Sequence, residues 1–271
     1  MKIKEIYTNS NNFGNLTFVK DNPFARVERF LATLDPVCSQ NYYRNKETLR
    51  LFLLEKMNFE QVSAAYGTNE NFIYAADLEK DLGHELMHMA FTKFVDGQGR
   101  TFSDASSWSH ELYPLEEGMA EFLSSLINER EIETYGIESF TAKMLYTSTD
   151  KKILVPCFCA DSDAIIKMFQ EKDIHNVLMN LAIFHYNEIC GTELNPEYEE
   201  EGYTECFCDM LEALIDIEIN RGKTQERLGK YRDIFLSSLE EEVIKYEVED
   251  FCQDYHNKAR KLIDWKIGRR R

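Results

Sequence analysis

Apolar residues recur at intervals of three and four along most of this chain, a spacing typical of amphipathic helices. The first twenty residues differ, because KIKEIYT and LTFVK alternate around the polar run NSNNFGN and predict a small β-hairpin. Helical spacing then appears in NPFARVERFLATL and NKETLRLFLLEKM, and Asn22 with Pro23 predicts a cap and a first turn. A second extended piece, NFIYAA at residues 71–76, precedes the next helix.

From Ser107 onward the periodicity is almost entirely helical. It is interrupted by Tyr-Gly at 135 and 136 and by the acidic segment GTELNPEYEEEGY at residues 191–203. We therefore predict an α+β protein that is predominantly helical, with a small N-terminal β-sheet. We divide the chain into residues 1–136 and a helical region at residues 137–271, with a candidate break at 191–203.

The composition is that of a protein with a real core: the chain has 271 residues, of which 44% are hydrophobic. No apolar run approaches the roughly 18–20 residues that cross a bilayer, and MKIKEIYTNSNN lacks the apolar stretch of a signal peptide. We therefore expect a soluble cytoplasmic protein.

The odd number of cysteines, seven, agrees with a reducing cytosol. The two CFC triplets lack the paired C-x2-C spacing of zinc modules, so we interpret them as buried thiols.

The charge balance limits the partners. The formal net charge of −17, from 48 acidic and 31 basic residues, argues against nucleic acid or an anionic membrane as the main partner. The basic cluster KIGRRR at the end of the sequence is interpreted as a solvated helix end whose cations complement the helix dipole.

The stretch DLEKDLGHELMHMAF, residues 77–91, carries the candidate chemistry. Asp77 is a natural N-cap, and a buried apolar stripe is predicted at Leu78, Leu82, Leu86, Met89 and Phe91. Helical spacing puts His84 and His88 on one face, one turn apart, where two imidazole nitrogens can converge on one ion. Glu85 lies about 100° further round the helix, where it can reach a water bound to that ion.

A catalytic zinc needs a third protein ligand, and YPLEEGMAEFLSSLINER at residues 113–130 can supply it. We predict a helix with Pro114 near its first turn. Its core stripe is predicted at Leu115, Met119, Phe122, Leu123 and Leu126. Glu117 and Glu121 then share one face, one turn apart.

With EEGMAEF following His84-Glu85-Leu86-Met87-His88, the chain resembles the gluzincins, the thermolysin-like and aminopeptidase-like zinc metallopeptidases. The resemblance covers roughly residues 71–130. It implies a zincin-like core within residues 1–136, with the region 137–271 completing or covering the cleft. It implies one Zn²⁺ per chain, a peptide or protein substrate, and Glu85 as the general base that activates the metal-bound water.

The same resemblance assigns the third ligand to Glu117, the glutamate before Gly118, and implies that Glu121 holds His84, the first zinc histidine, by a hydrogen bond. Glu116 stands where the family commonly has asparagine and competes with Glu117 for the ligand role. The spacing to Glu121 favours Glu117. The segment NFIYAA would be the family's edge strand, which binds an extended peptide, or a plain core strand.

Several features leave alternatives open. The residue that would stabilise the oxyanion is Tyr113, Tyr135, Tyr146 or His185 by order along the chain, and any of the tyrosines also fits a packing role. His110 lines the cleft or is an exposed loop residue, whereas His175 and His256 carry no motif. The alternatives to a peptidase are a catalytically silent zinc-binding helical interaction module and a regulatory protease of a mobile element.

Overall fold

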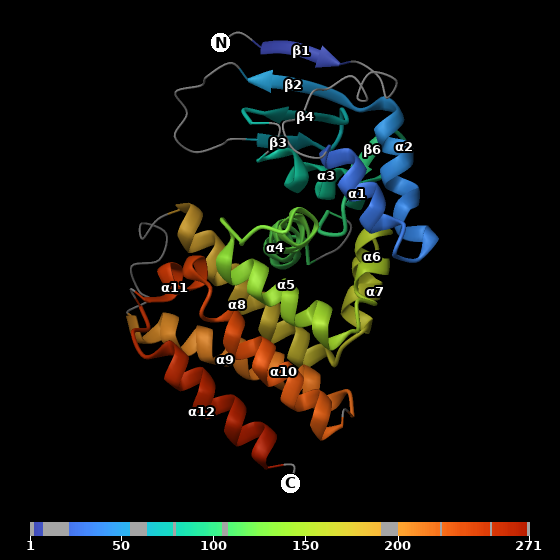
Figure 1. The fold of residues 1–271 in the computed structure, drawn as a ribbon. Coiled ribbons are helices and arrows are strands. Elements are labelled where there is room, and N and C mark those ends of the chain that lie inside the picture. The colour runs from blue at the N-terminus through green and yellow to red at the C-terminus, as the bar shows by residue number, and fades with distance from the viewer. Residues whose placement is uncertain are drawn as a thin grey trace. The chain divides into compact units, whose positions relative to one another are not determined.

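The computed structural model describes residues 3–7, 22–54, 64–77, 80–104, 108–190, 200–222, 224–249 and 251–269. The described chain is mostly helical with two small β-sheets (Figure 1), which confirms the predicted α+β class with a predominance of helix. None of the described helices combines the length and the apolar character that a membrane crossing requires.

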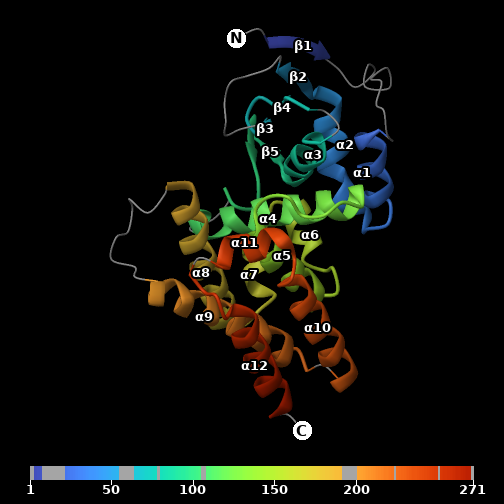
Figure 2. The ribbon, with the colours of Figure 1, turned by 60° about the vertical axis from the view of Figure 1, so that its left-hand side comes forward.

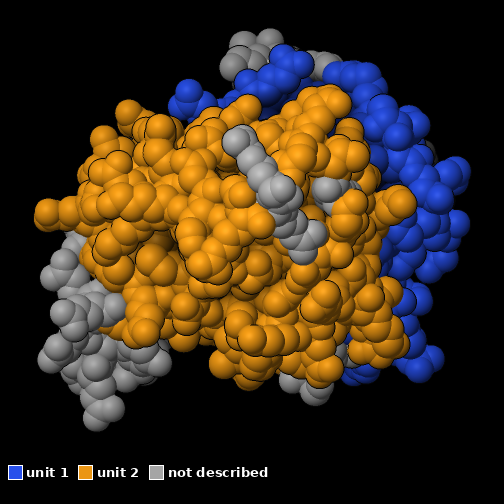
Figure 3. All heavy atoms as spheres, turned by 90° about the horizontal axis from the view of Figure 1, so that it is seen from below, with its two compact units in different colours: residues 1–107, 123–131, 154–162 blue, residues 108–122, 132–153, 163–271 orange. Residues whose placement is uncertain are grey.

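The chain forms two compact units, coloured separately in Figure 3. Unit 1 comprises residues 1–107, 123–131 and 154–162, and unit 2 comprises residues 108–122, 132–153 and 163–271. Because these segments alternate along the chain, a single cut after residue 136 does not separate the two units. The division into a zincin-like core at residues 1–136 and a covering region at 137–271 stays a prediction. Most of the candidate break at 191–203 lies outside the described residues.

Unit 1 holds both β-sheets. Its elements are β1 (Ile3–Tyr7), α1 (Pro23–Leu31), the 3-10 helix η2 (Pro36–Ser39), α2 (Gln40–Thr48), β2 (Arg50–Leu54), β3 (Ala64–Gly67), β4 (Phe72–Ala75), α3 (Leu82–Phe91), β5 (Lys93–Val95), β6 (Gln98–Arg100) and α6 (Leu154–Phe158). The four-stranded sheet has the order β1-β2-β4-β3, and β5 pairs with β6 in a small hairpin. Figure 1 shows the four strands side by side in this order.

The central pair of the four-stranded sheet, β2 and β4, is parallel and sets the buried face. Leu51 lies opposite Ile73 in the register, and both side chains are fully buried. On the alternate positions Phe52 and Tyr74 are only half-buried and their rings are 5.4 Å apart. The strand period of two thus gives the sheet one core face.

Three predictions for this region need correction or completion. The segment NFIYAA is not an edge strand: β4 lies between β2 and β3, which is the core-strand alternative. The second predicted helix is only partly correct, because it ends as α2 at Thr48 and the apolar run after it forms β2. A short apolar run fits a buried strand as well as a helix. Strand β1 confirms the first half of the N-terminal hairpin, but it pairs with β2, and residues 8–21 lie outside the described part.

Unit 2 is built from helices. They are most of α4 (Ser109–Asn128), α5 (Gly136–Ser148), α7 (Ser162–Lys167), α8 (Glu171–Cys190), α9 (Glu200–Asn220), α10 (Gln225–Ser238), α11 (Glu242–Glu249) and α12 (Tyr255–Gly268), as Figures 1 and 2 show. The core of the unit contains Phe140 of α5 against Phe235 of α10, with ring centroids 5.3 Å apart. Tyr231 is buried as well, and its hydroxyl donates to the Leu214 carbonyl at 3.1 Å.

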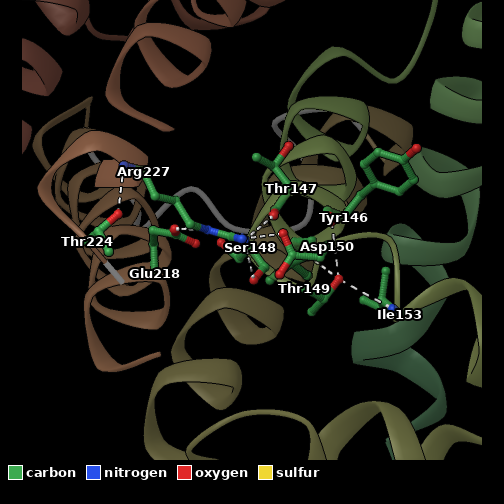
Figure 4. A network of polar contacts seen from close by, with 10 residues as sticks. Tyr146, Thr147, Ser148, Thr149, Asp150, Ile153, Glu218, Thr224 and Arg227 are labelled. Atoms are coloured by element: carbon green, nitrogen blue, oxygen red, sulfur yellow. Dashed lines mark hydrogen bonds and ion pairs between the residues drawn. The ribbon is translucent and has the colours of Figure 1, made fainter. Parts of the chain in front are cut away.

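Helix α5 is held at both ends by charged side chains from later helices. At its start, Gly136 N and Ile137 N each donate to the Glu247 carboxylate of α11, both at 2.7 Å. At its end, Arg227 Nη2 donates to the Thr147 carbonyl at 3.1 Å (Figure 4). Arg227 is itself held by Glu218, at 3.1 Å from Nε to Oε1, and by Asp150. A carboxylate at the N-terminus and a guanidinium at the C-terminus both complement the helix dipole.

The cysteines only partly match the prediction of buried thiols. Cys38, Cys157 and Cys252 are buried, whereas Cys159, Cys206 and Cys208 are half-buried. Burial raises the pKa of Cys38 to about 11. The side chain of Cys190 lies outside the described part of the structure.

Candidate metal centre

Helix α3 carries the histidine pair, and its start differs from the prediction. The helix begins at Leu82, and Asp81, not Asp77, occupies the N-cap position. Asp77 instead closes the turn before the helix, because its Oδ1 accepts from Lys80 N at 3.2 Å and its carbonyl accepts from Asp81 N at 2.9 Å. The predicted stripe is confirmed at Leu82, Leu86, Met89 and Phe91, which are all fully buried, and Leu78 lies outside the described residues.

The C-terminal end of α3 is held by neutral polar groups. The buried Asn45 amide of α2 donates to the Met89 carbonyl at 2.9 Å and to the Thr92 carbonyl at 2.7 Å. The Thr92 hydroxyl donates to the His88 carbonyl at 2.9 Å. These bonds satisfy carbonyls that a helix end leaves without an intrahelical partner. Asn45 therefore fixes the helix that presents the two histidines.

The two histidines converge as their spacing predicts. Their Nε2 atoms are 3.0 Å apart and their ring centroids 4.8 Å apart. His84 is half-buried and His88 is buried at 9% exposure, so the pair has limited access to solvent. Glu85, beside His84, is buried at 7% exposure.

Helix α4 starts earlier than predicted. It runs from Ser109, so Pro114 lies in its second turn instead of its first. A proline there has no N–H for the carbonyl four residues back, which belongs to His110. The Tyr186 hydroxyl of α8 donates to that carbonyl at 3.1 Å and compensates for the missing bond. The helix can therefore pass through Pro114 and place Glu117 one turn later.

Burial along α4 confirms most of the predicted stripe. Leu115, Met119 and Leu123 are fully buried and Phe122 nearly so, but Leu126 is 47% exposed, so its assignment to the core was wrong. The apolar period of a helix defines one face, and packing decides how far along the helix that face is covered. Glu117 and Glu121 are buried too, at 6% and 2% exposure.

Two glycines, each beside a candidate ligand, allow close helix contacts. A Cβ at Gly83, just before His84, would lie 2.5 Å from Asn128 Nδ2 and 2.8 Å from Ser124 Oγ at the end of α4. A Cβ at Gly118, just after Glu117, would lie 2.2 Å from the Glu138 carbonyl oxygen of α5. Real Cβ atoms do not come so close, so a Cβ at Gly118 would meet backbone that cannot move aside, and one at Gly83 would require the two side chains to shift.

The structure brings His84, His88 and Glu117 together. Each offers one ligand atom, and these atoms all lie within 4.8 Å of one another. Ligands at 2.0–2.1 Å in a tetrahedral zinc site are separated by about 3.3 Å, close to the 3.0 Å between the two Nε2 atoms. Two imidazoles and a carboxylate are a donor set that zinc takes in catalytic sites. In the described part of the chain, no cysteine belongs to such a group.

The structure also gives contacts for Glu121 and for the candidates for the oxyanion-stabilising residue. Glu121 Oε1 accepts from Glu133 N at 3.2 Å, and its bond to His84 stays a prediction. Tyr113 donates a hydrogen bond to Glu117, and its ring packs on His185. Tyr135 stacks on His185 as well, with centroids 6.1 Å apart, which places three of the four oxyanion candidates in one cluster.

The fourth candidate and the other histidines lie in different settings. Tyr146 packs on Phe122, with ring centroids 5.1 Å apart. His110 is exposed, but it lies in the first turn of α4 and not in a loop. His175 packs on Trp108, and His256 pairs with Glu240 at 2.8 Å.

Sequence reasoning missed the residues that hold the site elements in place, which are Asn45, Gly83, Gly118, Tyr186 and Glu247. A glycine inside a helical pattern was the one available signal, because it is retained there at a cost unless close packing requires it. Comparisons with protein-family models, with curated proteins and with solved structures found no match for this chain.

Proposed function

We propose that this protein is a zinc-dependent metallopeptidase. The observation that carries the proposal is the convergence of His84, His88 and Glu117 on one point, with the buried Glu85 next to His84 in the sequence. This arrangement joins two imidazoles, one carboxylate ligand and a separate carboxylate that is not part of the ligand group.

Each residue then has a distinct task. His84, His88 and Glu117 would hold the ion. Zinc in such a site would supply a bound water of lowered pKa and would polarise a carbonyl group. The Glu85 carboxylate would accept a proton as the general base of peptide hydrolysis. The substrate is a peptide or protein.

Electrostatics also supports a divalent cation at this place. Four glutamates on α3 and α4, Glu85, Glu116, Glu117 and Glu121, are between 2% and 7% exposed. Burying several carboxylates costs free energy unless positive charge accompanies them. A dication between Glu117 and the histidines offsets part of that cost.

The first experiment measures metal content. The purified chain should contain about one zinc, and His84→Ala or His88→Ala should lose most of it. His175→Ala is the matched control, because that histidine packs on Trp108 and lies outside the ligand group. Full zinc retention in both ligand variants would refute the metal centre.

The second experiment removes the base alone. Glu85→Gln should keep the zinc and lower the rate on any peptide that the wild type cleaves by about 10²- to 10⁴-fold, the usual contribution of a positioned general base. The readout is cleavage of a peptide library with and without chelator. An unchanged rate in Glu85→Gln would contradict the mechanism. A zinc-loaded wild type that cleaves nothing would favour the silent binding module.

A further inference from the structure

Tyr113 lies one helical turn before Glu117, on the same face of α4. Its hydroxyl is hydrogen-bonded to the side chain of Glu117. A tyrosine hydroxyl is protonated at neutral pH, so it is the donor to the carboxylate. Carboxylates that bind a metal are commonly fixed by such a second hydrogen bond.

The ring of Tyr113 rests on a buried histidine–glutamate pair. Its centroid is 5.4 Å from that of His185 in an edge arrangement, and His185 Nδ1 lies 2.9 Å from Glu138 Oε1. His185 and Glu138 are each only 1% exposed. Their outer atoms, His185 Nε2 and Glu138 Oε2, have no hydrogen-bond partner among the described residues. A buried pair that leaves two polar atoms unsatisfied is costly, so it points to a role beyond stability.

Glu138 links this pair back to the metal ligand through its backbone. Its carbonyl oxygen lies against Gly118, the residue after Glu117, where it leaves no room for a Cβ. The side chain of Glu138 meanwhile holds His185, which supports Tyr113. Tyr113 therefore contacts the side chain of Glu117, and Glu138 contacts the backbone of the next residue.

We propose that Tyr113, supported by the His185–Glu138 pair, is the positioning residue for Glu117 and sets which carboxylate oxygen faces the metal. This inference rests on the proposed metal role of Glu117. Tyr113 acts through Glu117 and makes no contact with the metal. Its 40% exposure shows that the ring is not enclosed by the core, so removal of the hydroxyl alone leaves the packing in place.

The test measures zinc affinity of the full chain by competition with a chelator. Tyr113→Phe should weaken zinc binding by about 10- to 100-fold, the usual effect of removing a bond to a metal ligand. It should also change the visible spectrum of the Co²⁺-loaded chain, which reports ligand geometry. Tyr255→Phe is the control, because it removes a tyrosine hydroxyl bond elsewhere in unit 2, to the Leu239 carbonyl at 2.9 Å, and should change neither readout.

A double-mutant cycle shows whether Tyr113 works through Glu117. In a Glu117→Ala background, Tyr113→Phe should have no further effect on zinc affinity. Equal affinity and spectrum in Tyr113→Phe and wild type would overturn the inference and leave the proposed function standing. An additive effect in the cycle, or a Tyr113→Phe chain that does not fold, would also overturn it. A wild type without stoichiometric zinc would instead overturn the proposed function.

Discussion

Helix α3 in unit 1 and helix α5 in unit 2 are held by different kinds of interaction. In unit 1, the end of α3 is held by neutral groups, the Asn45 amide and the Thr92 hydroxyl. In unit 2, α5 is held by a carboxylate at its start and by a guanidinium at its end. Both solutions satisfy backbone groups that a helix cannot pair internally.

The difference determines how strongly each helix depends on ionic strength and pH. Bonds from a buried amide depend little on ionic strength or on protonation, since no charge is involved. Half-buried Glu247 and the 30% exposed side chain of Arg227 interact with helix ends through charge, and salt screens that interaction. The helix with the histidine pair is therefore the less sensitive of the two to salt.

The largest expected loss of stability comes from removing the neutral side chain that holds the end of α3. Asn45→Ala would leave the Met89 and Thr92 carbonyls without this donor inside the protein, at a cost of about 2–4 kcal/mol in the free energy of unfolding. Urea unfolding measures it. Asn41→Ala is the control, because the Asn41 amide donates a single bond, to Phe158 O at 2.8 Å, and should cost about half as much. Equal losses in the two variants would contradict the role given to Asn45.

Substitution of the two glycines is expected to change stability by an intermediate amount. Gly118→Ala would push a methyl group onto a backbone carbonyl, which cannot move aside, and should cost about 1–3 kcal/mol. Gly83→Ala meets only the side chains of Asn128 and Ser124, which can rotate, and alanine gains about 0.5–1 kcal/mol in helix propensity. Its net effect should be smaller. Thermal unfolding of both variants compares them, and a greater loss in Gly83→Ala would show that the order is wrong.

The smallest effect is expected at the charged cap of α5. Glu247→Gln removes the charge and should cost about 1 kcal/mol at low salt. The gap to wild type should narrow in 1 M NaCl, whereas the gap caused by Asn45→Ala should not. Glu226→Gln, at an exposed pair with Lys230, serves as the charge-matched control and should change stability less. A salt-independent loss in Glu247→Gln would mean that the cap acts through geometry alone.

The candidate ligands could be named from the sequence because their arrangement is local. His84 and His88 share a helix face by their spacing, and Glu117 was distinguished from Glu116 by its distance to Glu121 along the next helix. The group of three that the structure assembles contains these residues. Whether they bind zinc stays a prediction.

What the sequence could not supply depends on partners far along the chain. The start of α4 was misplaced because a proline normally begins a helix, and only Tyr186 makes its later position acceptable. The run LRLFLL was assigned to a helix because its pairing with β4 is a long-range contact. Leu126 has the right period for the core, but at its place on α4 the side chain is 47% exposed.

The cap on α5 also has a consequence for the order in which the protein matures. Glu247 lies 111 residues after Gly136. At the usual synthesis rates of about 5–20 residues per second, the ribosome adds Glu247 roughly 6–22 s after the helix start that it caps. The residues that hold the C-terminal end of α3, Asn45 and Thr92, by contrast, lie before residue 100 in the sequence. During synthesis the bonds at the end of α3 can therefore form before the cap on α5.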